Sequence, residues 1–204
     1  MTGTLMHVHR PPLVLHLRPA VKLSDEQFFQ FCRLNPDLRI ERTAEGDVEI
    51  MSPAGGRTGN RNAGITAQLW MWALRDGTGD AFDAATGFIL PNGAVRAPDA
   101  AWVRMSRLEE LTEEQQERFL PLCPDFAIEL RSPSDRLRAA QAKMQEYTEN
   151  GAALGWLIDA PNRRVYVYRP KAEVERLDQP ATLSGDPELP GFVLDLTPVW
   201  QTRF

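Results

Sequence analysis

Apolar positions along the chain alternate between short runs with a period of two and longer segments with a period of about 3.6 residues. The longer segments predict helices over residues 24–36, 57–77, 111–120 and 135–150, and the first and third begin with capping boxes. The helix over 57–77 has the clearest pattern, and Gly77 is its expected end. Its apolar stripe is expected to consist of Ile65, Leu69, Trp72 and Leu74.

The runs with a period of two predict strands, several of them joined by short turns. These strands are expected as a hairpin over 38–52, two strands over 81–90 and 94–104, a strand over 124–131, a hairpin over 154–170, and weak strands near Val174 and Phe192. Residues 1–22 show no sustained period and are expected to form an extended arm, with one domain over 23–204. The order of elements predicts an α/β fold in which helices flank a central mixed β-sheet.

The composition limits the number of domains and the class of protein, but it does not indicate a function. The chain has 204 residues, 43% of them hydrophobic and 25% charged, which suits one globular domain. No apolar run approaches the ~20 residues that span a bilayer, so we expect a cytoplasmic protein without a membrane partner. Cys32 and Cys123 lack metal-type spacing and are expected to be free thiols.

The net charge of −5 argues against coating nucleic acid through bulk electrostatics, although local basic clusters could still hold a phosphate backbone. The alternative is that these clusters are solvated faces of ordinary elements. They comprise Arg57 and Arg61; Arg131, Arg136, Arg138 and Lys143; and Arg163, Arg164, Arg169 and Lys171.

The run "PDFAIELRSPSD", residues 124–135, places acidic side chains on a strand that otherwise looks buried. Alternation puts Asp125, Ala127, Glu129 and Arg131 on one face, opposite an apolar face. That apolar face consists of Phe126, Ile128 and Leu130. Half-buried carboxylates are costly unless a cation or hydrogen bonds compensate them.

Asp99 lies on an earlier strand, directly after Pro98. If the two strands are neighbours in the sheet, Asp99 and Glu129 could converge on one Mg²⁺, which prefers oxygen ligands. The alternative is that each acid pairs with an arginine, for which Arg104 and Arg131 are available.

Lys143 lies at the edge of the apolar stripe of the next helix, beside Ala140 and Tyr147. From there it can pack its stem against the core and extend its ammonium group toward the end of the preceding strand. The alternative is an ordinary surface lysine.

In this order, "APDAAWV", "PDFAIELRSPSDR", a lysine and "Y…NGAALGWLIDAPNRRVYVY" resemble the Uma-two family of restriction endonucleases, a group in the PD-(D/E)XK nuclease superfamily. The upstream "RIERTAEGDVEIMSPAG" is similar to the family's acidic hairpin, so the resemblance runs from about Leu23 to Tyr168. It implies a restriction-endonuclease-like core, Mg²⁺-dependent hydrolysis of phosphodiester bonds in DNA with Mn²⁺ as a substitute, and a homodimer.

Carried over residue by residue, the resemblance assigns Asp99 and Glu129 as metal ligands, helped by the Leu130 carbonyl and by Glu41 on the first hairpin. Lys143 is the catalytic lysine, which this family supplies from the following helix, and Tyr147 supports it. We expect Arg131, Arg136 and Arg61 to contact the phosphate backbone.

Two positions depart from the family pattern. Arg131 replaces the lysine that the superfamily carries two residues after the acid, and arginine is a poor proton-transfer group. Where many relatives have a histidine after Met-Ser-Pro, this chain has Thr58 or Asn60.

These departures keep a second function open, a weakly active or inactive member that binds nucleic acid or a partner protein. A third alternative is a metal-independent hydrolase, such as a glycosidase, with Asp125 and Glu129 as its carboxylate pair.

Overall fold

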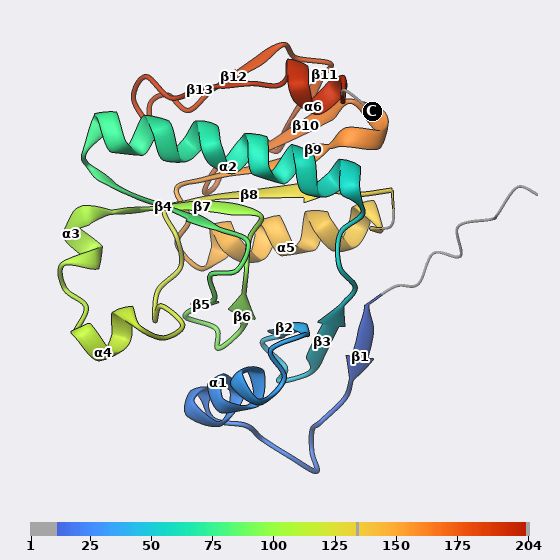
Figure 1. Cartoon of the computed structure of the whole chain (residues 1–204), viewed down its shortest axis with the longest axis vertical. Coiled ribbons are helices and arrows are strands. Elements are labelled where there is room, and N and C mark those ends of the chain that lie inside the picture. The colour runs from blue at the N-terminus through green and yellow to red at the C-terminus, as the bar shows by residue number, and fades with distance from the viewer. Residues whose placement is uncertain (1–11, 134, 203–204) are drawn as a thin grey trace, which may run out of the picture.

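A computed structural model describes residues 12–133 and 135–202 and shows a mixed α/β fold with helices on both faces of a central sheet (Figure 1). Residues 1–11, about half of the expected N-terminal arm, lie outside the described residues. This architecture is the predicted fold class.

The central sheet has six strands in the order β11-β10-β9-β8-β7-β4. β8 and β9 run parallel, and every other neighbouring pair in this sheet is antiparallel, so the sheet is mixed as predicted. Its strands are β4 (Gly79–Asp83), β7 (Ala100–Arg104), β8 (Phe126–Arg131), β9 (Leu154–Asp159), β10 (Arg164–Tyr168) and β11 (Glu175–Asp178).

Two long helices cover opposite faces of this sheet (Figure 1). The first, α2 (Gly56–Asp76), packs against β4 and β7, and the second, α5 (Leu137–Glu149), packs against β8 and β9. α5 also connects β8 to β9, because two parallel strands require a crossover rather than a tight turn.

A second sheet of five antiparallel strands lies below the central one in Figure 1, in the order β1-β3-β2-β6-β5. It comprises β1 (Leu13–Leu15), β2 (Arg39–Arg42), β3 (Val48–Met51), β5 (Phe88–Ile89) and β6 (Val95–Arg96). α1 (Asp25–Leu34) packs against it through Phe28, which contacts a small core on β2, β3 and β6. The described part of the expected arm therefore contributes a strand, since β1 pairs with β3.

The remaining elements are short. They are α3 (Met105–Leu108), α4 (Glu113–Gln116), a 3-10 helix η1 (Ala160–Asn162), β12 (Thr182–Ser184), β13 (Val193–Asp195) and α6 (Thr197–Trp200). The strands expected near Val174 and Phe192 correspond to β11 and β13, whereas β12 and α6 were not predicted.

The starts of α1 and α4 and the end of α2 follow the local signals in the sequence. Ser24 and Thr112 each form the expected capping box, and Gly77 ends α2 with a positive φ of 70°. The predicted apolar stripe of α2 was wrong at Leu74, which is 58% exposed, while Ala73 is buried. At about 100° per residue, Leu74 is turned well away from the Leu69 stripe, whereas Ala73 lies one turn further along it.

The two strands expected over 81–90 and 94–104 were also wrong in part, because each run divides between the two sheets. Asp83 ends β4 by accepting a hydrogen bond from the backbone N–H of Ala85 at 3.0 Å. Such local bonds compete with strand pairing, and the chain then turns into β5 of the second sheet.

The alternation predicted for β8 decides where its acidic side chains point. Phe126, Ile128 and Leu130 lie in the core under α2, while Ala127 lies in the core under α5. Glu129 therefore lies on the α5 face of the sheet, in the C-terminal half of β8.

In the described part of the chain, no helix combines the length and apolar character that crossing a membrane requires.

Candidate active site

Glu129 meets two side chains of α5. The Lys143 ammonium group lies 2.8 Å from Glu129 Oε1, and the Tyr147 hydroxyl donates a hydrogen bond to the same oxygen at 3.0 Å. Lys143 and Tyr147 are four positions apart, so one helical face presents both to the strand. Lys143 is thus not an ordinary surface lysine, since its side chain is only 16% exposed.

Glu41 reaches the same ammonium group from the second sheet. Its Oε1 lies 2.8 Å from Lys143 Nζ and accepts a hydrogen bond from the backbone N–H of Ala97 at 3.1 Å, and its Oε2 lies 3.3 Å from Arg96. Glu41 is 2% exposed. We call Glu41, Asp99, Glu129 and Lys143 the acid–lysine cluster.

Asp99 lies directly before the first residue of β7, so the Leu130 N–H of β8 has no partner on β7 in the strand ladder. Its Oδ2 accepts the Leu130 N–H at 2.8 Å, and its Oδ1 accepts the Asn62 amide at 2.9 Å. Arg39 lies 3.6 Å from Oδ1. In a strand, the N–H and C=O of one residue point to the same edge, so the Leu130 carbonyl is also directed to the side on which Asp99 lies.

The electrostatics of the cluster follow from burial and from these pairs. Burial raises the pKa of Glu129 to about 7; Asp99 and Glu41 add to that rise, and Lys143 opposes it. Burial alone would lower the pKa of Lys143, but the two glutamates raise it above its ordinary value. Lys143 is therefore charged at neutral pH and is suited to stabilising negative charge rather than to accepting a proton.

The remaining pKa shifts agree with this picture. Burial would raise the pKa of Glu41, yet Lys143 and Arg96 hold it below its ordinary value. The pKa of Tyr147 is raised well above its ordinary value by burial and by the Glu129 carboxylate, so its hydroxyl remains a hydrogen-bond donor.

Arg104 and Arg131, the arginines expected as alternative partners of Asp99 and Glu129, pair with other acids, and the arginine near Asp99 is Arg39. Arg104 lies 3.5 Å from Asp125, and Arg131 lies 2.6 Å from the fully buried Asp159. Asp125 also pairs with Arg107 at 3.0 Å and accepts the Arg104 N–H. Asp125 therefore fixes the start of β8 through these arginines. Because its carboxylate is already paired, it is poorly suited to form a catalytic pair with Glu129.

The three arginines expected at the phosphate backbone have different surroundings. Arg136 is exposed directly before α5, whereas Arg61 donates its Nε–H to the Val199 carbonyl at 2.8 Å. Partial burial lowers the pKa of Arg61, and the positive charge of the neighbouring Arg57 lowers it further. Arg131 is the least available of the three, since Asp159 and the Asp135 carbonyl accept its hydrogen bonds.

Sequence reasoning missed three residues that build the site. Asn62 holds Asp99 from α2, Arg39 approaches Asp99 from β2, and Arg96 pairs with Glu41, Glu49 and Glu146. Alternation would have placed Arg39 on the same face as Glu41, and helical spacing places Asn62 one turn before the buried Ile65. Thr58 and Asn60, expected at the histidine position, also lie on α2, but Asn62 is the α2 residue that bonds Asp99.

The oxygen atoms of Asp99, Glu129 and the Leu130 carbonyl are the kind of ligand that a hard divalent cation prefers. Within residues 12–133 and 135–202, no group of three His, Cys, Asp or Glu side chains is arranged to hold a metal. Mg²⁺, however, is commonly held by one or two carboxylates together with water and substrate phosphate. Asp99, Glu129 and the Leu130 carbonyl offer such oxygens, and the raised pKa of Glu129 marks a place where added positive charge would be favourable.

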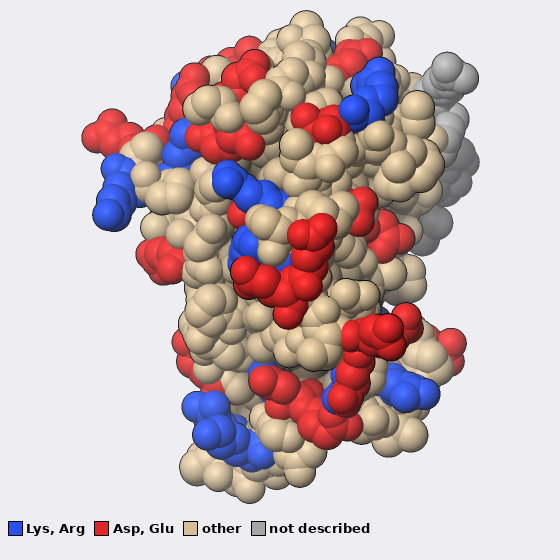
Figure 2. All heavy atoms as spheres, turned by 90° about the vertical axis from the view of Figure 1, so that its left-hand side faces the viewer, with Lys and Arg blue, Asp and Glu red and all other residues tan. Residues whose placement is uncertain are grey.

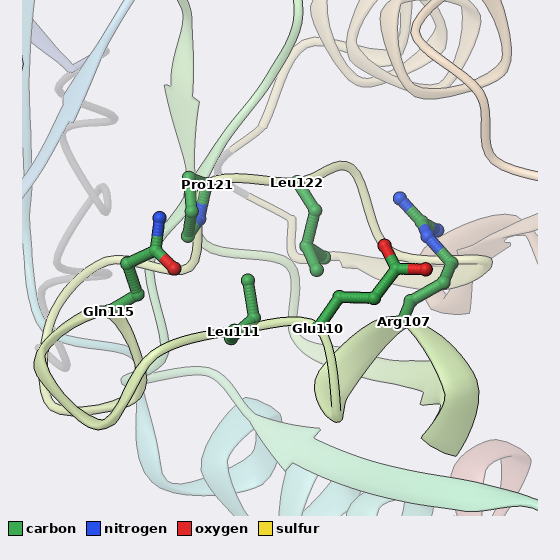
Figure 3. Close-up of a pocket in the computed structure, with 6 residues that line it drawn as sticks. All are labelled: Arg107, Glu110, Leu111, Gln115, Pro121 and Leu122. Atoms are coloured by element: carbon green, nitrogen blue, oxygen red, sulfur yellow. The ribbon is translucent and has the colours of Figure 1, made fainter.

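Hollows on the surface of the described residues include one beside the acid–lysine cluster and one away from it. One, with a volume of about 460 Å³, begins at Asp99. We call it the Trp70 groove, and its lining residues are Asn62, Ala63, Thr66, Ala67, Trp70, Asp83, Ala84 and Asp99. The other, of about 360 Å³, lies beside α3 and α4 and shares no residue with the acid–lysine cluster (Figure 3).

Comparisons with known proteins match the chain to one family model and to a solved structure of the same fold. Residues 25–197 match the model of the Uma2 family, which is described as "Putative restriction endonuclease". The crystal structure of a "putative nuclease belonging to DUF820" from Anabaena variabilis superposes with a TM-score of 0.72 at 18% identity, covering 87% of this chain and 97% of that one. No curated protein matches the sequence.

Proposed function

The chain belongs to the Uma2 family, and on that premise we propose that it hydrolyses phosphodiester bonds in DNA with the help of a divalent cation, Mg²⁺ or Mn²⁺. The observation that carries the proposal is the convergence of Asp99, Glu129 and a charged Lys143 where β7, β8 and α5 meet. Two carboxylates and an ammonium group suit a reaction that develops negative charge on phosphate oxygens.

Asp99 and Glu129, with the Leu130 carbonyl, would hold the cation, and Glu41 would act beside them. When bound, such a cation polarises a phosphate oxygen and makes a water more acidic. The protein groups around it keep the ligands in place: Asn62 and the Leu130 N–H orient Asp99, and the Tyr147 hydroxyl orients Glu129.

Lys143 acts as a fixed positive charge in this proposal. Its Nζ directs hydrogen bonds to Glu41 and Glu129, and an ammonium group has three donors. A donor can therefore face a phosphate oxygen while the glutamates hold the side chain. Because its pKa is raised, Lys143 stabilises charge in the transition state and does not serve as the base.

Surface charge favours the approach of DNA from one side. Acidic side chains gather on the face that carries α3 and α4 (Figure 2), where the exposed residues include Glu109, Glu110, Glu113, Glu114 and Glu117. That face would repel phosphates. The starts of α2 and α5 lie toward the other end of the central sheet (Figure 1) and carry exposed arginines, namely Arg57, Arg136 and Arg138.

The test is cleavage of supercoiled plasmid and linear DNA by the purified protein in Mg²⁺, Mn²⁺ or EDTA. We expect cleavage that needs the cation and is lost in Asp99→Asn and in Glu129→Gln. Asp125→Asn is the matched control, because it removes an acid of the same strand region that is committed to Arg104 and Arg107. Cleavage that survives both site substitutions would refute the assignment.

A second candidate function is a nucleic-acid-binding module without cleavage. The observation that favours it is that Arg131, at the superfamily's lysine position, is committed to Asp159, while both oxygens of Asp99 already accept hydrogen bonds. This alternative predicts that DNA binding weakens steeply as the salt concentration rises. It also predicts that no DNA is cleaved in Mg²⁺ or Mn²⁺.

A further inference from the structure

The Trp70 groove begins at the acid–lysine cluster and runs along α2. Asp99 and Asn62 line its inner end, and Trp70 lines it two turns further along the helix. Eight residues of helix correspond to about 12 Å. The groove therefore extends from the proposed phosphate position across a length comparable with a nucleotide.

The walls of the groove are apolar and aromatic rather than basic. Ala63, Ala67 and Ala84 form small, flat walls, and Trp70 is 49% exposed. None of the eight lining residues is a lysine or arginine, whereas Asp83 and Asp99 are acidic. A phosphate would be repelled here, but a planar, uncharged ring could stack on the indole.

Asn62 provides a second and independent observation. Its Nδ2 donates to Asp99, whereas its buried Oδ1 accepts no hydrogen bond among the described residues. More than about 90% of buried polar groups in proteins are paired. Asn62, which lines the groove, thus carries a buried acceptor without a protein partner, and an N–H donor on a ligand could satisfy it if the amide turned toward the groove. The exocyclic amines of adenine, cytosine and guanine are such donors.

We propose that the Trp70 groove binds one unpaired nucleobase of the strand whose phosphate lies at Asp99 and Glu129, stacked on Trp70. This inference rests on the proposed function and specifies that one base beside the cleaved bond is unpaired, either in single-stranded DNA or in a duplex from which that base has left the stack. A base within a duplex cannot enter a groove on a helix surface unless it leaves the stack.

The experiment measures binding with Ca²⁺ in place of Mg²⁺ or Mn²⁺, so that a divalent cation offsets the charge of Asp99 and Glu129, and gel electrophoresis of the recovered strands checks that they remain uncut. Fluorescently labelled single-stranded oligonucleotides, the same sequence as a duplex, and an abasic strand of equal length are titrated with the wild type and with Trp70→Ala. We expect Trp70→Ala to weaken single-strand binding by about fivefold or more, and to leave the duplex and the abasic strand unchanged.

Met71→Ala is the matched control, because Met71 is 50% exposed on the same helix and does not line the groove. It should bind like the wild type. If Trp70→Ala and Met71→Ala bind the single strand equally well, or if Trp70→Ala weakens the abasic strand as much as the natural one, the nucleobase subsite is refuted.

The proposed function fails by a different result. A wild-type protein that binds the single strand through Trp70 but cleaves nothing in Mg²⁺ or Mn²⁺ supports the subsite and refutes the nuclease. Cation-dependent cleavage that is indifferent to Trp70→Ala on single-stranded and duplex DNA supports the nuclease and refutes the subsite. If Trp70→Ala instead changes the elution volume in size-exclusion chromatography and not the binding of any strand, the groove is an interface between copies of the chain and the subsite is refuted.

Discussion

Lys143 Nζ lies 2.8 Å from Glu129 Oε1, across the junction between α5 and the end of β8. The same ammonium group lies 2.8 Å from Glu41 Oε1, on a strand of the other sheet. One buried cation therefore joins two carboxylates from separate sheets, and its loss should affect folding as well as chemistry.

Replacing Lys143 by Met should lower the free energy of unfolding by about 3 kcal/mol, because removing one partner leaves uncompensated buried carboxylates. Urea denaturation in EDTA measures the change. Lys22→Met, at an exposed lysine, is the control and should be within about 0.5 kcal/mol of the wild type. Adding Glu129→Gln to Lys143→Met should restore part of the loss, and a strictly additive double variant would contradict the coupling.

The pKa of Glu129, raised to about 7, predicts a pH-dependent stability of the cation-free protein. Since the folded pKa lies above the unfolded one, the contribution of Glu129 is fully present below about pH 4.5 and is lost as the pH rises through about 7. The free energy of unfolding of the wild type should therefore fall relative to that of Glu129→Gln as the pH rises from 5 to 8. Thermal unfolding of both proteins in EDTA measures the difference, and a constant difference over this range would contradict the raised pKa.

The same shift predicts that a divalent cation competes with a proton. Calorimetric titration with Mn²⁺ should show affinity that rises by about tenfold from pH 6 to pH 8 and then levels off. The direction follows because the ionised carboxylate is the ligand. Asp99→Asn should abolish the heat of binding, and affinity that does not change with pH would argue that Glu129 is not a ligand.

Asp125 and Glu129 should separate stability from activity. Asp125→Asn is expected to lower the free energy of unfolding by about 1–3 kcal/mol, since Arg104 and Arg107 lose a charged partner. Its cation-dependent cleavage rate should stay within about twofold of the wild type at a temperature where both are folded. Denaturation followed by circular dichroism measures the stability, and plasmid cleavage measures the activity. A loss of cleavage without a loss of stability would indicate that Asp125 belongs to the active site.

Two glycines test the packing of α2 and the sheet. A Cβ atom on Gly79 would lie 2.2 Å from the Val103 carbonyl oxygen, so Gly79→Ala should lower the free energy of unfolding by about 2 kcal/mol or more. Gly64→Ala meets no atom within 4 Å and lies inside α2, so it should stabilise the protein by about 0.5–1 kcal/mol. Urea denaturation measures both variants, and equal effects would contradict the packing.

Local signals predicted much of the fold because they depend on neighbours in the sequence. Alternation separated Glu129 from Phe126, Ile128 and Leu130, and the stripe of α5 placed Lys143 beside Tyr147. The strand pattern also suggested that Asp99 could meet Glu129, and the resemblance to a nuclease family added Glu41; the structure brings all four members of the acid–lysine cluster together.

Partners across the fold could not be predicted in the same way. The pairs Arg131–Asp159 and Arg107–Asp125 depend on which elements become neighbours and in what register. The division of the runs over 81–90 and 94–104 between two sheets has the same origin, since strand propensity does not specify the sheet that a strand joins.

The sequence by itself determined most of the longer elements, the faces of β8 and α5 on which their side chains lie, and which residues carry charge, because these properties arise within a few residues of chain. Only the tertiary structure decided that Lys143 is shared by Glu41 and Glu129, that Asn62 and the Leu130 N–H hold Asp99, and that a groove ending at Trp70 opens beside them. The physical reason is that buried charges are compensated by whatever groups the packed elements bring within hydrogen-bonding distance.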